Sequence, residues 1–355
     1  MSRIYTNGWE NGHLGEWEIT SVAKTEVEII DNDWLAAKNQ YMLPIENGKY
    51  AITISGGRYI EYDLSRLPSY PVGGMRNIYA RFKMQSSIPS YNSTYFSLYN
   101  GASYILHLGY NPISMYSYKT LVTDLFIEPY KWYTVEMYVE ISTTRSIEDG
   151  SIHIKVNGVD ILNETNVSTT NIIAADQWAT ILRLSGPPGA GTNYITLYDD
   201  IVICDSTTSL TDASIIRGIP SAVGANNNWD PDPSTKETYE CVDDVGAQAT
   251  VETDYIIALG TGGKETFPIT IDSTAAVTNV ESISVRTRSR RAGATSAYKI
   301  IPILRSGGVD YEKVSQNLSD DFEEYLGIWE QNPNTSLDWS ASDLNNIEVG
   351  VKSDE

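Results

Sequence analysis

Two acidic side chains occupy alternate positions of one predicted strand: Glu61 and Asp63, in the segment that begins at Tyr59. Alternate residues of a strand face the same side of a sheet, so both carboxylates are expected to point into one cleft. Paired carboxylates of this kind supply the nucleophile and the acid of retaining glycoside hydrolases. The corresponding motif, Glu-x-Asp-x-x-Glu, needs a third acid where this chain has Arg66. Half of the catalytic machinery is therefore missing, and hydrolysis is the weakest of the functions considered.

Other catalytic patterns are absent from the sequence. The histidines His13, His107 and His153 belong to no His-Glu-x-x-His motif, and the chain has no Gly-x-Ser-x-Gly or Cys-x-x-Cys. The glycine-rich run at 186–191 lacks the Lys-Ser/Thr pair that completes a phosphate-binding loop. We therefore expect a protein that is not an enzyme and that carries no cofactor.

Metal binding is not expected either. The acidic pairs Asp199-Asp200 and Asp320-Asp321 match no EF-hand loop and are interpreted as solvated surface acids rather than calcium ligands. The two cysteines, Cys204 and Cys241, are too few for a metal site of their own, and we interpret them as small buried thiols of a protein made in a reducing cytoplasm.

One basic run stands out in an acidic chain, and it contains Arg286, Arg288, Arg290 and Arg291. On a strand the first three share one face, with Val285, Thr287 and Ser289 on the other. Arginine pairs with carboxylates in a bidentate manner, so the row is predicted to be an assembly interface that docks on an acidic surface. Residues 306–355, with 12 acidic and 2 basic side chains, offer such a surface within the subunit or on a neighbour. A solvated strand face is an equally weighted alternative.

Tyrosine is unusually frequent: 24 Tyr stand against 5 Phe, and 19 of them lie in residues 1–206. Half-exposed sheet faces account for most of them, because the ring packs while the hydroxyl stays hydrated. Tyrosine rings also stack on sugars, which suggests carbohydrate binding as an alternative function. The candidate carbohydrate-binding residues are Tyr91, Tyr95, Tyr110, Tyr116 and Tyr118.

Composition excludes several further classes of function. The 355 residues carry a net charge of -21, and this field opposes binding to nucleic acid. The apolar runs are much shorter than the roughly 20 residues that span a bilayer, so membrane insertion is not expected. The N-terminal residues, Met1 to Tyr5, lack the apolar core of a secretory signal.

Short runs with period-2 alternation recur along the chain, for example at 50–54, 78–84, 133–140 and 151–156, and they predict strands with one buried face. Asn157-Gly158 predicts a tight hairpin turn. Strand patterns resume at 254–259 and continue to 298–304, after a polar, Thr/Ser-rich linker. One short helix is expected near Asp343, with Ser340 as its N-cap. The fold class is all-β, with domains at 1–206 and 207–355.

The first domain resembles the concanavalin/laminin-G-like jelly roll. The resemblance lies in the segments 132–136 and 150–158, which look like its central hairpin, in 198–203, which looks like its terminal strand, and in Gly8-Trp9-Glu10, which looks like its opening. It implies an N-terminal jelly-roll sandwich followed by a smaller, mainly-β domain.

Residues 207–355 are similar to a segment common in structural proteins of tailed bacteriophages. The residues that carry this similarity lie at 229–231, 239–244, 253–256, 332–335, 339, 343–345 and 348–352. The combination implies a non-enzymatic virion subunit, with capsid decoration or a head appendage favoured over a tail role because fibre repeats are lacking. The implied partners are other capsid or tail proteins, further copies of the chain and host-surface glycans, with assembly in the bacterial host cytoplasm.

Overall fold

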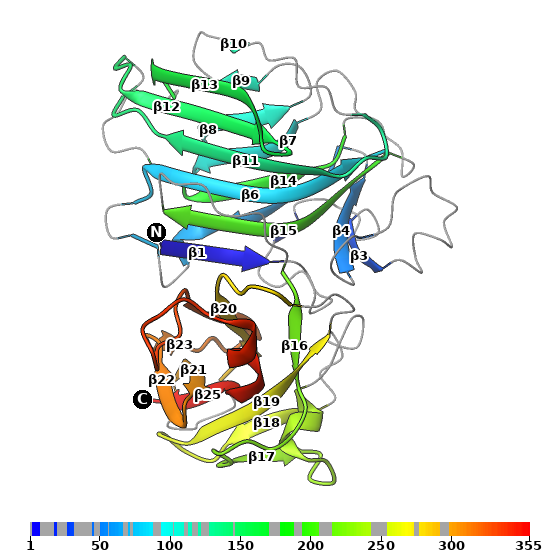
Figure 1. Cartoon of the computed structure of the whole chain (residues 1–355), viewed down its shortest axis with the longest axis vertical. Helices are drawn as coiled ribbons and strands as arrows, with labels where there is room; N and C mark the ends of the chain where they lie inside the picture. The colour runs from blue at the N-terminus through cyan, green and yellow to red at the C-terminus, as the bar shows by residue number, and fades with distance from the viewer. Residues whose placement is uncertain are drawn as a thin grey trace. The chain divides into compact units, whose positions relative to one another are not determined.

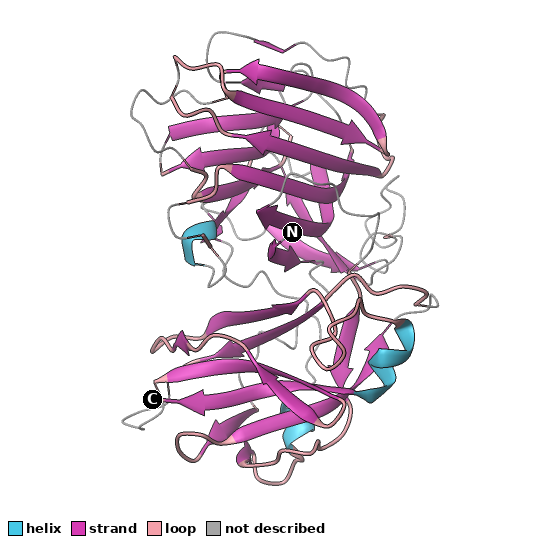
Figure 2. Cartoon of the chain, turned by 60° about the vertical axis from the view of Figure 1, so that its left-hand side comes forward, coloured by secondary structure: helices cyan, strands magenta, loops and turns pink. Residues whose placement is uncertain are grey.

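The computed structural model describes most of the chain. The described residues are 2–7, 18–19, 27–31, 45, 50–55, 57–66, 70–71, 74–87, 94–101, 103–109, 113–115, 120–121, 128–144, 146–169, 178–187, 194–205, 215–242, 254–272, 277–291 and 298–355. Strands make up nearly all of the ordered structure, and the helices are short turns (Figure 2). The all-β fold class is confirmed.

Two compact units make up the chain. Among the described residues, those up to Ile215 form the first unit and Ile216–Glu355 form the second. The predicted domain boundary at residue 206 falls in a stretch outside the described residues. Each unit has its own sheets and its own buried cluster, so the two are treated separately below.

The first unit is a sandwich of two antiparallel sheets. One sheet has the strand order β13-β12-β11-β6-β15-β4-β3, with β1 also paired to β15, and the other has the order β10-β9-β8-β7-β14-β5-β2. In Figure 1 the first sheet forms the front layer, with β7, β8 and β14 behind it. The strands of this unit are β1 (Ser2–Asn7), β2 (Glu18–Ile19), β3 (Val27–Asp31), β4 (Tyr50–Ser55), β5 (Tyr59–Asp63), β6 (Asn77–Ser86), β7 (Thr94–Asn100), β8 (Ser103–Gly109), β9 (Ile113–Met115), β10 (Thr120–Leu121), β11 (Tyr133–Glu140), β12 (Gly150–Val156), β13 (Val159–Val167), β14 (Ile181–Ser185) and β15 (Ile195–Asp205), with a 3-10 turn η2 (Leu64–Arg66).

The alternation read from the sequence places the core between these sheets. In β11 and β12 buried and partly exposed residues alternate along the whole strand. Phe82 of β6 stacks on Phe96 of β7, with ring centroids 5.2 Å apart. Aromatic side chains bury large apolar areas, so this contact joins the two layers at their centre.

The hairpin and the closing strand follow the predictions. Asn157 and Gly158 both have positive φ, +50° and +75°, as a two-residue hairpin between β12 and β13 requires. The amide oxygen of Asn157 also accepts the Thr134 N–H at 2.9 Å. The last strand of the unit, β15, pairs antiparallel with the first, β1.

The second unit packs a two-stranded ribbon on a larger sheet. Its main sheet has the order β16-β19-β25-β21-β22, with β23 on β21, while β17-β18 and β20-β24 form two-stranded sheets. The β20–β24 pair is the ribbon that packs on the main sheet. Trp329 and Trp339 lie in a buried cluster with Leu304 and Ile347, and this cluster joins the ribbon to the main sheet. The elements are β16 (Arg217–Pro220), β17 (Trp229–Asp232), η3 (Thr238–Cys241), β18 (Tyr255–Ala258), β19 (Lys264–Asp272), β20 (Ile283–Ser289), β21 (Lys299–Ser306), β22 (Val309–Glu312), β23 (Gln316–Asn317), β24 (Glu323–Trp329), η5 (Ala341–Asn346) and β25 (Ile347–Asp354).

The short helix expected near Asp343 is present as the 3-10 turn η5. Ser340 is its N-cap, and a capping box joins Ser340 to Asp343. Hydrogen bonds from the Ser340 backbone and hydroxyl lower the pKa of the Asp343 carboxyl. Within the described part of the chain, no helix has the length and apolar character needed to cross a membrane.

Candidate functional site

The arginine row lies on the outer face of the β20–β24 ribbon. The register pairs Arg286 with Leu326 and Arg288 with Glu324. Val285 is buried on the opposite face, whereas Arg288 and Arg290 are exposed. The predicted division of this strand into an arginine face and a packed face is therefore confirmed.

Two of the arginines bind acids of the same unit. Arg286 pairs with Glu324 at 2.7 Å, and both side chains are largely buried, 17% and 7% exposed. Arg291 pairs with Asp320, whose side chain is exposed. Both acids belong to the acidic stretch 306–355, so part of the expected acidic partner surface lies within the subunit.

The other two arginines stack on an aromatic ring. The guanidinium carbons of Arg288 and Arg290 lie 4.8 and 4.7 Å from the ring centroid of Phe322. Cation–π contacts of this kind hold a guanidinium in place over an aromatic ring. The role of the whole row in assembly remains a prediction.

A charged network covers one face of the main sheet of the second unit. Lys264 lies 3.0 Å from Asp310 and 2.9 Å from Glu312, and Lys352 lies 2.9 Å from Glu312. Burial raises the pKa of Asp310, but hydrogen bonds from Arg305 and Lys264 outweigh burial and lower it overall. The acids and bases neutralise one another, so this face is a structural network.

Glu265 is a fully buried acid on β19. Its oxygens accept N–H groups from Asn228 at 2.9 Å and Trp229 at 3.2 Å, and the Thr238 hydroxyl at 2.7 Å. Burial raises the pKa of this carboxyl despite these three hydrogen bonds. Glu265 thus anchors the segment that leads through β17 to η3.

The proposed hydrolase pair is occupied by structural contacts. Glu61 forms an ion pair with Arg183, whose guanidinium lies 3.8 Å from the Tyr59 ring and 4.2 Å from the Tyr99 ring. Asp63 accepts the backbone N–H of Ser65 at 3.0 Å and its hydroxyl. The two carboxylates thus contact different partners, Glu61 an arginine of β14 and Asp63 the turn that follows its own strand.

The tyrosines expected to bind sugar are only partly covered by the structure. Tyr95 has no exposed area and packs inside the sandwich, so its assignment to a sugar-binding surface is wrong. Its strand, β7, is buried on both faces, which period-2 alternation alone does not reveal. Tyr91, Tyr110, Tyr116 and Tyr118 lie outside the described residues.

A buried ion pair on the first sheet is a feature that sequence reasoning missed. Lys83 of β6 lies 3.0 Å from Asp200 of β15, with side chains 9% and 3% exposed. Asp199 and Asp200 were predicted to be solvated acids, but both are buried. Asp200 has a φ of +50° at a β-bulge, which turns its carboxylate toward Lys83.

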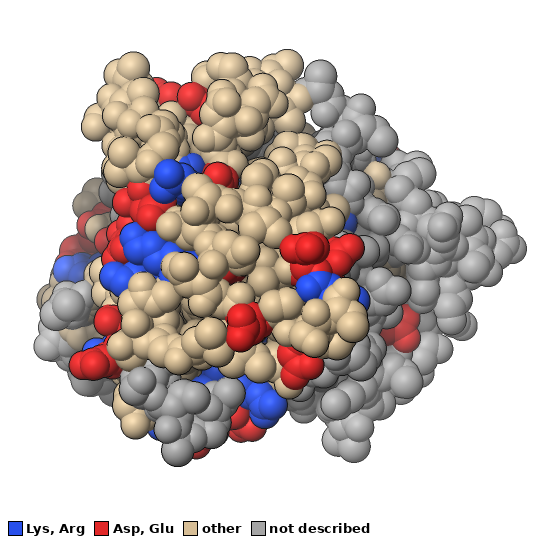
Figure 3. Space-filling view, turned by 90° about the horizontal axis from the view of Figure 1, so that it is seen from below, with Lys and Arg blue, Asp and Glu red and all other residues tan. Residues whose placement is uncertain are grey.

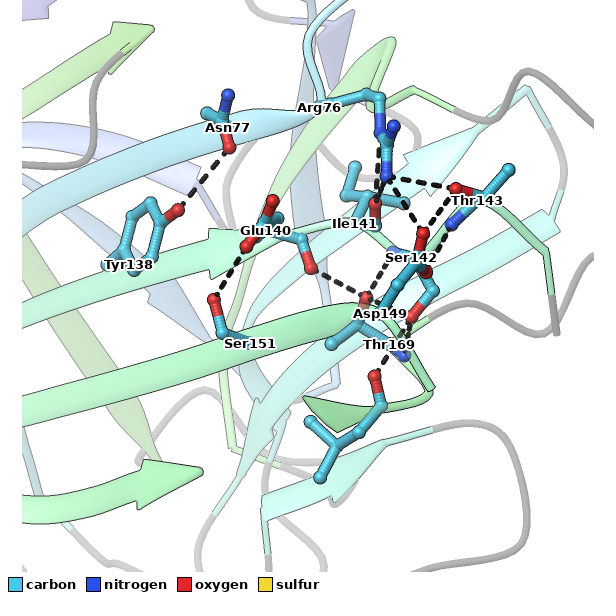
Figure 4. A network of polar contacts seen from close by, with 11 residues as sticks. Arg76, Asn77, Tyr138, Glu140, Ile141, Ser142, Thr143, Asp149, Ser151 and Thr169 are labelled. Carbon is cyan, nitrogen blue, oxygen red and sulfur yellow. Dashed lines mark hydrogen bonds and ion pairs between the residues drawn. The ribbon is translucent and has the colours of Figure 1, made fainter. Parts of the chain in front are cut away.

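Figure 4 shows a second polar network, which joins the end of β11 to the start of β12. Arg76 donates to the Ile141 carbonyl, and the Thr143 N–H donates to Asp149 at 2.8 Å. Ser142 and Thr169 exchange backbone-to-hydroxyl hydrogen bonds at 2.7 and 2.8 Å. This network holds Ser142, Thr143 and Asp149, which lie between the two strands, to Arg76 and Thr169.

Metal-ligand clusters and disulfides do not occur among the described residues. No group of three or more His, Cys, Asp or Glu side chains there has the geometry to hold a metal ion. Cys204 and Cys241 are both buried, and neither forms a disulfide. Burial raises the pKa of the Cys241 thiol, which favours its protonated form.

Comparisons with known proteins identify only a distant likeness in fold. No family model and no curated protein matches the chain. Cip1, a cellulose-induced protein, is 10% identical and matches 58% of this chain and 100% of its own length, with a TM-score of 0.38. Endo-β-1,4-glucuronan lyase from the fungus Trichoderma reesei is 14% identical over 57% of this chain and 95% of the lyase, with a TM-score of 0.35. The receptor-binding domain of botulinum neurotoxin D is 13% identical over 59% of this chain and 50% of that domain, with a TM-score of 0.36. At such scores the likeness carries no conclusion about activity.

Proposed function

We propose that this chain is a non-enzymatic structural protein of a tailed-bacteriophage virion. In this proposal the second unit docks on the particle, as a capsid decoration or head appendage, and the first unit is displayed outward. Its partners are other virion proteins and further copies of the same chain, and assembly takes place in the host cytoplasm.

The observation that carries the proposal is the place of the phage-like residues in the second unit. Trp339 is buried and donates its indole N–H to the Trp329 carbonyl at 2.9 Å. Trp229 donates its indole N–H to the Gly263 carbonyl at 3.1 Å. Asp343 closes the capping box of η5. Trp229, Trp339 and Asp343 thus pack or cap within one unit, which supports the proposal that the similarity extends over a folded domain.

A further motif residue supports the same interpretation. A side chain at Gly350 would place its Cβ only 1.9 Å from the Glu265 carbonyl oxygen, so this strand position requires glycine. Glu348, two residues earlier, accepts the Thr266 hydroxyl at 2.6 Å and the Ala225 N–H at 2.8 Å. Packing within the fold therefore requires Gly350, and hydrogen bonds hold Glu348 in place. Related docking domains would share these requirements.

Mass spectrometry and immunogold microscopy of density-purified phage particles test the proposal. We expect the chain at a fixed copy number per particle, with antibodies against the recombinant protein labelling one defined part of the virion. If the chain is abundant in the lysate and missing from purified particles, the proposal is wrong.

A carbohydrate-binding adhesin of the tail is the second candidate. It is favoured by the partly exposed contact of Tyr59 on β5 with Arg183 on β14, since aromatic rings and guanidinium groups are common in sugar recognition. A glycan array probed with the whole chain tests it, with R183A as the matched variant. Binding to host-surface glycans that R183A abolishes would support the adhesin. An array without binding leaves the structural role alone.

Hydrolysis is tested on the same preparation. A glycoside hydrolase would release reducing ends from host polysaccharide and lose this activity in E61Q, while an inactive wild-type protein excludes it.

A further inference from the structure

A carboxylate of β22 is hydrogen-bonded to both a lysine amine and an asparagine amide. Asp310 Oδ2 lies 3.0 Å from Lys264 Nζ, and the same oxygen accepts the side-chain N–H of Asn226 at 3.2 Å. The other carboxylate oxygen, Oδ1, accepts the same amide group, also at 3.2 Å. The amine and the amide thus share one acceptor atom, although they belong to different segments of the chain.

Strand β19 holds the amide and the amine close together. The Asn226 N–H donates to the Thr266 hydroxyl at 3.1 Å, and the Asn226 carbonyl accepts the Thr266 N–H at 3.0 Å. Lys264 precedes Thr266 by two positions on β19, so both side chains project from the same face of that strand. The side chains of Lys264 and Asp310 are mostly covered, with 25% and 13% of their area exposed. The three groups therefore meet on a rigid part of the second unit.

The asparagine distinguishes this contact from an ordinary ion pair. Figure 3 shows basic and acidic side chains side by side on the face that it presents, so contacts between opposite charges are common there. A carboxamide carbon can in addition be attacked by an amine, and a carboxylate in contact with both groups can move the protons that this attack displaces. Holding the reacting groups together makes such a step unimolecular. Lys264, Asn226 and Asp310 thus supply a nucleophile, an electrophile and a proton carrier.

We propose that Lys264 and Asn226 become joined by a covalent amide bond, with Asp310 as the group that carries the proton. Asp310 accepts a proton from the Lys264 ammonium, and the neutral Nζ attacks the side-chain carbonyl carbon of Asn226. The bond between Nζ and this carbon forms, and the bond between the carbon and Nδ2 breaks. Asp310 returns its proton to the departing Nδ2, and the second proton lost by Nζ leaves with the ammonia as ammonium. The step needs no oxidant or reductant, and it does not depend on the proposed virion role.

The charge of the amine limits the rate of this step. Glu312 lies 2.9 Å from Lys264 Nζ, and its hydrogen bond is the main cause that raises the pKa of the Lys264 amine. The amine must lose a proton before it can attack, so the crosslink is expected to form slowly after folding and faster in alkaline solution. E312Q removes the main cause of the raised pKa and should therefore speed the reaction severalfold.

An amide between Asn226 and Lys264 would fasten one segment of the second unit to the main sheet. This segment carries β17, η3 and β18. A covalent link between its two ends constrains the unfolded chain, as a disulfide does, and so favours the folded state. Unlike a disulfide, an amide is not broken by reducing agents. The crosslink would therefore protect the second unit against unfolding in a reducing compartment.

Mass spectrometry of the whole chain, purified and then incubated in alkaline solution, tests the proposal. We expect the intact mass to fall by one ammonia, and a tryptic digest to contain a branched peptide in which Lys264 is joined to Asn226. K264R keeps the positive charge without a primary amine, and D310N keeps a polar side chain without the carboxylate. Neither variant should form the branched peptide, whereas E312Q should form it faster than the wild type.

The branched peptide gives the decisive result. Succinimide formation at an Asn-Gly pair also releases ammonia, but it occurs equally in K264R and leaves Lys264 open to trypsin. Thermal unfolding checks that each variant is folded, and K264R serves as the control if D310N is not. A wild-type chain without the branched peptide after incubation, and with Lys264 fully cleaved by trypsin, overturns the proposal. A folded D310N that forms the peptide as fast as the wild type overturns the role of Asp310.

Discussion

The buried pair of Lys83 and Asp200 is expected to be a principal electrostatic determinant of stability in the first unit. Lys83 Nζ lies 3.0 Å from Asp200 Oδ2, and the other carboxylate oxygen accepts the Ile215 N–H at 2.6 Å. Removing one partner leaves the other charge buried and without this ion pair. We therefore consider D200N, K83M and the double variant K83M/D200N.

The magnitude follows from the burial of both groups. Breaking a buried ion pair from one side costs about 3–5 kcal/mol, whereas replacing both partners by neutral groups is often close to neutral. Asparagine tolerates the positive φ of residue 200, and its oxygen still accepts the Ile215 N–H, so D200N removes the charge alone. We expect a loss of about 3 kcal/mol for each single variant, and recovery of about 2 kcal/mol or more in the double variant.

Urea unfolding followed by tryptophan fluorescence measures these differences. Two units can unfold in separate transitions, so the transition of the first unit must be identified. D310N, in the second unit, serves as the control, because it should shift only the transition that D200N leaves in place. Costs below about 1 kcal/mol for both single variants, or strictly additive losses in the double variant, would refute the view that this pair is buried and coupled.

Three further predictions concern pH and glycine positions. Burial raises the pKa of Glu265. The stability that this pKa shift contributes is complete below about pH 4.5 and is lost as pH rises through the folded pKa. E265Q should remove this part of the pH dependence in unfolding titrations. The pKa of Asp310 is lowered, so its contribution is present above about pH 3.8 and is lost as pH falls through the folded pKa; D310N should be less stable at pH 7 and flatter in acid, and an unchanged acid limb would contradict this. Gly74 and Gly158 both have positive φ, but an added Cβ at Gly74 lies 2.0 Å from the Trp178 ring and one at Gly158 meets nothing. Calorimetry should therefore show a cost of about 1 kcal/mol for G158A and a clearly larger one for G74A, and equal costs would refute the clash.

Local signals in the sequence predicted local structure well. The Asn157-Gly158 turn and the Ser340 cap with Asp343 depend only on residues within one turn of each other, and both are found as expected. The arginine and packed faces of β20 follow from alternation in the same way. These features need no knowledge of distant parts of the chain, because backbone geometry and neighbouring side chains determine them.

The wrong assignments share one physical cause. Alternation tells which residues share a face of a strand, but it does not tell whether something covers that face. β7 and β15 are buried on both faces. Tyr95 and the two acids of β15 are therefore buried, although the alternation predicts that they face solvent. The burial of the Asp200 carboxylate also depends on Lys83, which is 117 residues away in the sequence, and on a β-bulge that no short sequence motif predicts.

The sequence also does not predict which partners the arginines contact. The spacing predicts which face of the strand the arginines share, but their partners depend on the β24 register, which brings Glu324 beside Arg286 and Phe322 beside Arg288. A shift of that register by one residue would move Glu323 onto the arginine face and Phe322 away from it. The contacts of Arg288 and Arg290 with the Phe322 ring would then be lost. The pairing of two strands, rather than the basic composition of one, therefore determines which side chains the arginine row contacts.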